Sequence, residues 1–243
     1  EHNMVPVLSP CPMAGATAQF SIIGTVLQTI VENLFFATVV YALRPGYPML
    51  WGGASAGLDV QGGDVCYGGI ERRLMLLANI DMAVFYGIPA NSPAGSLDSC
   101  LIDCQAGAEK TWTYFTRLLS HAASGLVLGA VTNGKAMSAE QLVIDVDIIK
   151  NVMRFAAGIE TDHLAQAIKE IKEVGAGGNF MEAPTTMELL REGEYLYPTT
   201  FNRDGTDASP MLERAHNEVE SLLSNWRSPV PENIQGELER LLN

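Results

Sequence analysis

The sequence predicts an α/β fold: a partial TIM-type (β/α)8 barrel of about four parallel strand–helix units, followed by a helical C-terminal tail. Short apolar segments alternate with long helical patterns, and each apolar segment ends in small or polar residues. Beyond residue 133 the pattern becomes almost entirely helical. The expected strands are residues 5–9, 47–53, 82–88 and 125–130.

Apolar residues at helical spacing predict the helices that connect and follow these strands. The longest, residues 20–43, is nearly continuously apolar, but Gln28, Glu32 and Asn33 near its middle favour a core helix buried against a sheet over a membrane span. Ser138 and Gln141 form a capping box that begins another helix. The remaining expected helices are residues 71–81, 104–124, 139–157, 161–174, 209–226 and 231–242.

The number of strand–helix units is half that of a closed barrel, which takes about 250 residues. An open four-stranded sheet would expose two edges, which is an aggregation hazard. We therefore expect residues 1–200 to be the C-terminal half of a larger barrel, with residues 201–243 as a helical tail packed on the same domain. The other half would come from chain outside this sequence or from a second copy, and we expect a homo-oligomer.

Composition excludes several functional classes. The chain has 243 residues, 47% of them hydrophobic and 18% charged, as in folded α/β proteins. A net charge of −13 disfavours non-specific nucleic-acid binding, which needs a cationic surface. No secretory signal opens the sequence, and the four cysteines form no CxxC pair. We therefore expect a cytoplasmic protein with reduced thiols that binds neither membranes nor nucleic acid.

Parallel sheets place chemistry at the carboxyl ends of their strands. In this sequence those ends are residues 9–13, 51–55, 91–103 and 132–133, and a polar, glycine-rich loop follows the second of them. Any functional site is expected to be formed from these segments.

Three motifs in register resemble the trimethylamine methyltransferase family, which includes glycine betaine methyltransferase. The first is Pro-Met-Ala-Gly-Ala-Thr at residues 12–17, followed by a helix that contains Glu32. The second is Arg-Pro-Gly-Tyr-Pro at residues 44–48, with Trp-Gly-Gly at 51–53 and Tyr-Gly at 67–68. The third is Leu-Asp-Ser at residues 97–99, leading to Asp-Cys-Gln-Ala-Gly-Ala-Glu-Lys at 103–110. The resemblance extends over residues 5–200.

The resemblance implies a TIM-type barrel that moves a methyl group from a methylated amine to the cobalt of a separate corrinoid protein. The cobalamin is then carried by that partner, and none is bound directly by this chain. Family chains are nearly twice as long. The trimethylamine enzymes use pyrrolysine, which is not written here, so the chain looks more like the branch without it. A His–Thr pair that the family often has is replaced by Pro-Thr-Thr at residues 184–186.

Demethylation of a quaternary ammonium requires a site that holds a cation and excludes water, because the leaving group departs as a neutral amine. Aromatic faces and carboxylates both attract such cations. The resemblance therefore implies two groups of site residues. The substrate-binding group is Met13, Trp51, Tyr67, Asp98 and Thr132, and the catalytic group is Asp98, Gln105 and Glu109.

Each of these residues also has a structural interpretation. Trp51 and Tyr67 could simply pack against the barrel rim, and Asp98 or Asp103 could cap the helix that begins near residue 104. Gln105 and Glu109, four residues apart, could share a solvated helix face.

Two other functions remain open. One is a noncatalytic half-barrel that binds or assembles with another chain. The other is a zinc-dependent thiol alkyltransferase using Cys11, Cys66, Cys100 and Cys104, although only Cys100 and Cys104 are closely spaced and no second pair completes a zinc set. We expect no bound metal.

Overall fold

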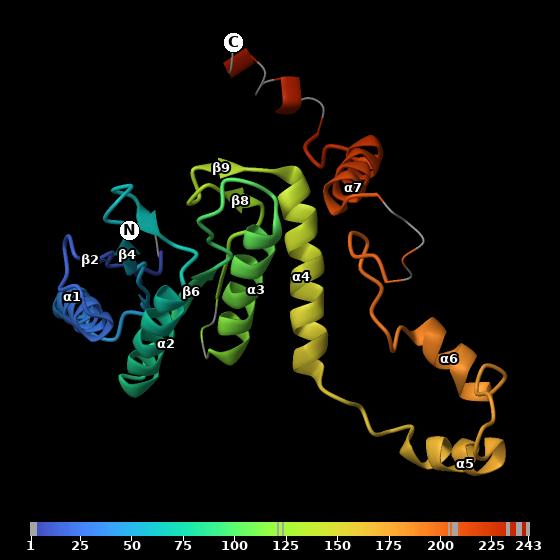
Figure 1. The fold of residues 1–243 in the computed structure, drawn as a ribbon. Coiled ribbons are helices and arrows are strands. Elements are labelled where there is room, and N and C mark those ends of the chain that lie inside the picture. The colour runs from blue at the N-terminus through green and yellow to red at the C-terminus, as the bar shows by residue number, and fades with distance from the viewer. Residues whose placement is uncertain are drawn as a thin grey trace.

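The computed structural model describes residues 4–120, 122, 124–203, 205, 209–231, 234–236 and 240–241 (Figure 1). Helices predominate, and the strands are short. The strands are β1 (Val7–Leu8), β2 (Met13–Ala14), β3 (Leu50–Trp51), β4 (Ala56–Leu58), β5 (Val65–Cys66), β6 (Asn91–Ala94), β7 (Ser124–Leu126), β8 (Ala130–Val131) and β9 (Ala136–Met137). The helices are α1 (Ile22–Leu43), α2 (Ile70–Phe85), α3 (Cys104–Leu119), α4 (Ala139–Ala157), α5 (Leu164–Val174), α6 (Pro184–Glu192) and α7 (Met211–Asn225).

Four parallel segments lie side by side in chain order. Strand β1 pairs in parallel with β3, a parallel bridge joins Trp51 to Ala90, and β6 pairs in parallel with β7. Long helices connect these segments, as parallel pairing requires. Two antiparallel pairs, β4–β5 and β8–β9, are added beside them. The structure is therefore a mixed α/β fold whose parallel segments have the order of successive strand–helix units.

The expected strand at residues 82–88 is wrong. Helix α2 continues to Phe85, because Ile80 and Ala83 keep the helical spacing of its buried face while Val84 and Phe85 point to solvent. The strand is instead β6, in the segment expected to follow the end of that strand. The expected strand at residues 125–130 is divided into β7 and β8, and Gly129, with φ +72°, lies between the two.

Most expected helices are confirmed. Helix α4 has the predicted bounds, and the Ser138 hydroxyl caps it by accepting the N–H of Gln141 at 3.1 Å. The other half of the expected capping box does not form, because the Gln141 side chain donates to Asp145 and the Ser138 N–H donates to the carbonyl of Gly129. Helix α6 was not expected. Of the helix expected at 231–242, residues 234–236 and 240–241 are helical, and the rest lies largely outside the described residues. Helix α7 packs against α4, whereas Figure 1 shows α5 and α6 projecting from the other helices.

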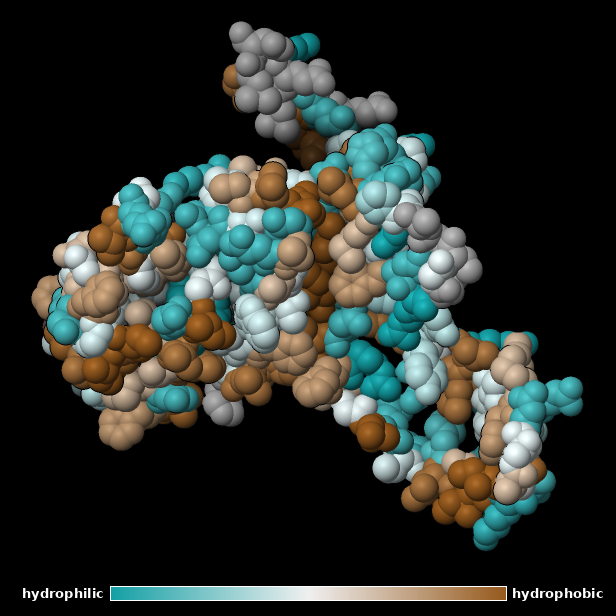
Figure 2. All heavy atoms as spheres, viewed as in Figure 1, coloured by the Kyte–Doolittle hydropathy of each residue, from teal (hydrophilic) through white to brown (hydrophobic). Residues whose placement is uncertain are grey.

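Helix α1 does not have the buried environment that the sequence suggested. Its inward face carries Thr25, Thr29 and Asn33, and the Asn33 amide donates to the carbonyl of Gly52 at 2.9 Å. Its outward face is apolar, as the brown side chains over α1 in Figure 2 show. Only 17% of its most apolar window is buried, and by length and composition it is the one described helix that could cross a membrane. The exposed side chains recur at every fourth position: Ile23, Leu27, Val31, Phe35 and Val39.

A buried ion pair fastens α3 to α4. The Lys110 ammonium lies 2.7 Å from the Asp145 carboxylate, and both side chains are fully buried. Asp145 also accepts the N–H of Gly129 at 2.8 Å and the amide of Gln141 at 2.7 Å. Burial lowers the pKa of Lys110, and Asp145 opposes that shift. The pair therefore holds two helices and the loop before β8 in one arrangement.

We predict that Lys110→Met lowers the free energy of unfolding by about 3–5 kcal/mol, because it leaves the Asp145 charge buried without its partner. Urea denaturation measures this change. The control is Lys169→Met, because Lys169 and its partner Glu173 are both more than half exposed, and loss of such a pair costs at most about 1 kcal/mol. Equal losses in the two variants would contradict the role given to Lys110.

Candidate functional site

The loop between β6 and α3 carries the candidate carboxylates to the end of the parallel segments. Asp103 caps α3, since its carboxylate accepts the N–H of Ala106 at 3.0 Å. The Ser99 hydroxyl also donates to Asp103, at 3.2 Å. The capping interpretation of Asp103 is therefore confirmed, and Asp98 remains available for another role.

Glu109 organises this loop from the first turns of α3. Its carboxylate accepts the N–H of Asp98 at 2.7 Å and the N–H of Ser99 at 3.2 Å. The Gln105 amide donates to the other carboxylate oxygen at 2.7 Å. Gln105 and Glu109 therefore share a helix face, as expected, but that face is directed at the loop and not only at solvent.

Asp98 links the loop to the segment that follows β5. Its carboxylate accepts the backbone N–H of Tyr67. Burial raises the pKa of Asp98, while the N–H groups of Gly68 and Tyr67 act in the opposite direction. Four of the predicted site residues, Tyr67, Asp98, Gln105 and Glu109, thus lie in one hydrogen-bonded group.

Two arginines in the first turn of α2 complete this group, and sequence reasoning did not find them. Arg72 and Arg73 are 3% and 1% exposed. Both donate to the carbonyl oxygen of Tyr67, and the Arg72 guanidinium carbon lies 4.7 Å from the centre of the Tyr67 ring. Burial lowers the pKa of Arg73 to about 9. The signal in the sequence was adjacent charges at the start of an otherwise apolar helix.

Thr132 borders the same group. Its N–H donates to the carbonyl of Ser99 at 2.9 Å, and the N–H of Asn133 donates to the carbonyl of Leu97 at 3.2 Å. Thr132 and Asn133 both have φ +54°, which is strained for a β-branched residue such as threonine. Such strain persists where surrounding contacts fix the backbone, and here the contacts come from the Asp98 loop.

Trp51 and Met13 lie elsewhere. Trp51 is fully buried, stacks on Tyr86 with ring centres 5.5 Å apart, and donates its indole N–H to Asn79 at 2.8 Å. These are the contacts of a core residue, and they leave no ring face for the cation that Trp51 was expected to hold. Met13 belongs to β2, which lies at one edge of the sheet β2–β4–β5. Tyr67 directly follows β5, at the other edge of the same sheet.

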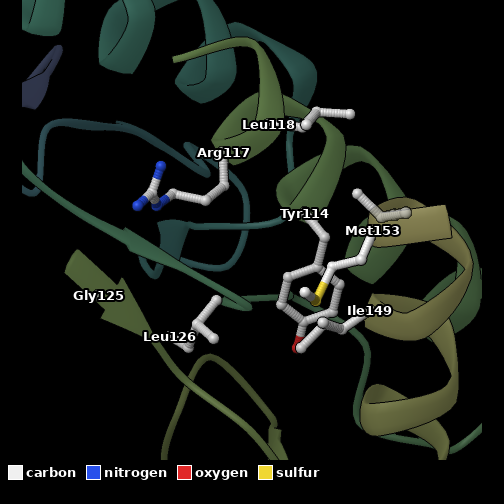
Figure 3. Close-up of a pocket in the computed structure, with 8 residues that line it drawn as sticks. Tyr114, Arg117, Leu118, Gly125, Leu126, Ile149 and Met153 are labelled. Carbon is white, nitrogen blue, oxygen red and sulfur yellow. The ribbon is translucent and has the colours of Figure 1, made fainter. Parts of the chain in front are cut away.

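A separate apolar pocket of about 540 Å³ contains none of the predicted residues. Figure 3 shows Tyr114 and Arg117 of α3, Leu126 of β7 and Met153 of α4 around it. The helical residues among them belong to the C-terminal halves of α3 and α4, so the pocket lies at the opposite end of α3 from Glu109.

The zinc alternative has no ligand set in the part of the chain that the structure describes. No group of three or more His, Cys, Asp or Glu side chains there could hold a metal ion. All four cysteines are free, and Cys11, Cys100 and Cys104 are exposed.

Parallel strand–helix units with charged residues gathered near the strand ends define an α/β protein with its candidate site at those ends. Comparison with known proteins gives the particular family. The sequence model described as trimethylamine methyltransferase matches residues 1–242, and the chain belongs to this family.

Three relatives are named methyltransferases. The glycine betaine methyltransferase of Desulfitobacterium hafniense is 30% identical over 95% of this chain and 49% of its own length. The L-carnitine:corrinoid methyltransferase of Eubacterium limosum is 31% identical over 84% of this chain and 43% of its own. The trimethylamine methyltransferase of Methanosarcina barkeri is 27% identical over 95% of this chain and 48% of its own. The chain thus spans about half the length of these relatives.

Gly68 allows the close approach between the Tyr67 segment and Glu109. We predict that Gly68→Ala destabilises the fold by about 1–3 kcal/mol, because the added methyl group overlaps the Glu109 carboxylate. Urea denaturation checks this. Gly57→Ala is the control, since its methyl group meets no atom within 4 Å. If Gly68→Ala is no more destabilising than the control, Glu109 is not held as described.

Proposed function

We propose that the protein takes part in methyl transfer from a quaternary or tertiary methylamine to the Co(I) of a separate corrinoid protein. The observation that carries this proposal is the convergence of Tyr67, Asp98, Gln105 and Glu109 at the strand ends. Membership of the trimethylamine methyltransferase family supports it. The methylated amine and the corrinoid protein are the proposed partners.

Asp98 is the proposed cation-binding carboxylate. Glu109 already accepts three hydrogen bonds, so its role is to position the loop that presents Asp98. A carboxylate and a cation about 4 Å apart attract by about 1 kcal/mol in water and by about 4 kcal/mol at an effective dielectric constant of about 20. The partial burial of Asp98 therefore strengthens its hold on an ammonium group.

The transfer itself needs no acid when the substrate is a quaternary ammonium. The bond between nitrogen and one methyl carbon breaks, and its electron pair stays on nitrogen, giving a neutral tertiary amine. The methyl group passes to the Co(I) acceptor, which supplies the electron pair of the new bond. This chain's contribution is to hold the cation in line for attack and to keep water from it.

The fold is proposed to be part of a TIM-type barrel. The parallel segments follow chain order, and the apolar outward face of α1 is unpartnered among the described residues. Both features, and the half-length match to the relatives, suit a barrel completed by further chain or by a second copy. They also suit the second candidate function, a noncatalytic half-barrel that assembles with another chain.

Mixing the purified protein with a Co(I) corrinoid protein and candidate amines separates the two functions. The enzyme gives the absorption change of methylation at cobalt in the presence of one amine and not in its absence. A noncatalytic subunit binds its partner and gives no such change with any amine.

We predict that Asp98→Asn weakens binding of the quaternary ammonium at least tenfold, because the amide keeps the shape of the carboxylate and loses its charge. Titration calorimetry measures the dissociation constant. Asp162→Asn, at an exposed position before α5, is the control and should leave it unchanged. Equal affinity of the Asp98→Asn variant and the unaltered protein would remove Asp98 from the site.

Ammonium binding should also weaken as pH falls. Burial raises the pKa of Asp98 above the ordinary 3.8, so the carboxylate gains its proton, and loses its attraction for a cation, at a higher pH than an exposed aspartate. Calorimetry over a pH series should show this loss in the unaltered protein and a flat profile in Asp98→Asn. A midpoint at or below 3.8 would contradict the assignment to Asp98.

A further inference from the structure

The outward face of α1 is a regular row of large apolar side chains. Residues spaced by four form a ridge on a helix, and such ridges pack into the grooves of another helix. Soluble monomers rarely leave so continuous an apolar surface uncovered, and Figure 2 shows it over α1. The row is therefore a contact surface whose partner is not among the described residues. Its members are 40–65% exposed: Ile23, Leu27, Val31, Phe35 and Val39.

Leu27 and Val31, near the middle of the row, point directly away from the strands. The side chains that face the strands are Thr25, Thr29 and Asn33. Leu27 and Val31 each lie two residues from Thr29, and two residues turn a helix by about 200°. A strand–helix unit added at a sheet edge packs beside α1 and reaches its flank rather than this line. The row therefore needs a surface that approaches α1 from outside the sheet.

A lipid surface does not suit α1, although the helix is long and apolar enough to cross a membrane. Helices that lie on membranes are rich in Lys and Arg, and none occurs between residues 22 and 43. The net charge of −13 opposes binding to anionic lipids. Insertion would also break the bond from the Asn33 amide to the carbonyl of Gly52. The face therefore suits a protein partner.

The distribution of charge favours a second copy of the same chain as that partner. A symmetric interface brings identical surfaces together, so a charge on it meets its own like charge. The chain carries a net charge of −13, but the row carries none. The single acidic side chain of α1, Glu32, is half-buried and accepts the amide of Gln28 at 2.7 Å. At α1, two copies can therefore meet without like-charge repulsion.

The size of the surface also suits a dimer. A stable interface buries about 800 Å² on each partner. Helix α1 has 22 residues and is therefore about 33 Å long. Helix α2 packs against α1 and adds the exposed side chains Leu74 and Phe85, which share a face because eleven residues make about three turns. The two helices together can supply the area of a stable interface.

We propose that two copies of the chain pair through α1 about a two-fold axis, with the ridges of the two helices interlocked and crossing near Val31. Val31 is the middle residue of the row, so an axis at this point places the whole row against the second copy. Interlocked ridges of this kind cross at about −50°. The row contains neither Asp98 nor Glu109, so this inference does not depend on the proposed function.

Sedimentation velocity over a concentration series tests the pairing. The unaltered protein should sediment as a dimer that dissociates on dilution. Leu27→Glu should weaken the dimer about 100-fold or more, because two carboxylates enter an apolar contact. The matched control is Leu222→Glu in α7, since Leu222 is 56% exposed and Leu27 is 55% exposed. The control should leave the dimer unchanged.

A cysteine at the proposed axis gives a second measurement, which does not require an added charge. Mild oxidation of Val31→Cys should link two copies through residue 31, because this residue meets its counterpart across the axis within reach of a disulfide. Peptide mass spectrometry identifies the link and distinguishes it from any link through the native cysteines. Leu222→Cys, at a similarly exposed position, should form no such link. If Leu27→Glu does not fold, this cross-link decides the proposal.

Three results would overturn the inference. The first is a monomer at every concentration, which would leave the row to further chain of the same protein. The second is a dimer that Leu27→Glu and Leu222→Glu weaken equally. The third is flotation of the unaltered protein, but not of Leu27→Glu, with phosphatidylcholine vesicles, which would assign the row to lipid. Failure of methyl transfer to the corrinoid protein would overturn the proposed function and leave the dimer standing.

Discussion

The Glu109 carboxylate is the interaction on which the candidate site depends. By accepting the N–H groups of Asp98 and Ser99, it fixes the loop between β6 and α3 against the first turns of α3. Asp98 then reaches the backbone of Tyr67, and the carbonyl of Ser99 receives the N–H of Thr132. Through Asp98 and Ser99, the Glu109 carboxylate thus links this loop to the segments that contain Tyr67 and Thr132.

The helices were largely predictable because their signals are local. Ser138 and Gln141 marked the start of α4, and Asp103 marked the start of α3, through caps that act within one turn. The strand at 82–88 was wrong because a run of apolar residues suits a buried strand and a helix equally. What decided the outcome was the contact of Ile80 and Ala83 with the core, which no local pattern contains.

Residues of the candidate site could be predicted where one sequence motif contained them. They could not be predicted where their role depends on whether the side chain is buried. Asp98, Gln105 and Glu109 came from one motif and lie together. Trp51 came from another, but its indole is taken up by Asn79 and Tyr86 in the core. The two arginines of α2 escaped notice because charged residues at a helix start usually lie in solvent.

Helix α1 buries hydroxyls and an amide beside Val26 on its inward face, while an apolar stripe faces out. The exposure of these apolar side chains in this chain alone therefore does not show that they tolerate substitution. A charged residue placed at Leu27 or Val31 would look harmless here, as surface substitutions usually are. If the proposed barrel is completed against this face, the same change would instead place a charge among packed apolar side chains.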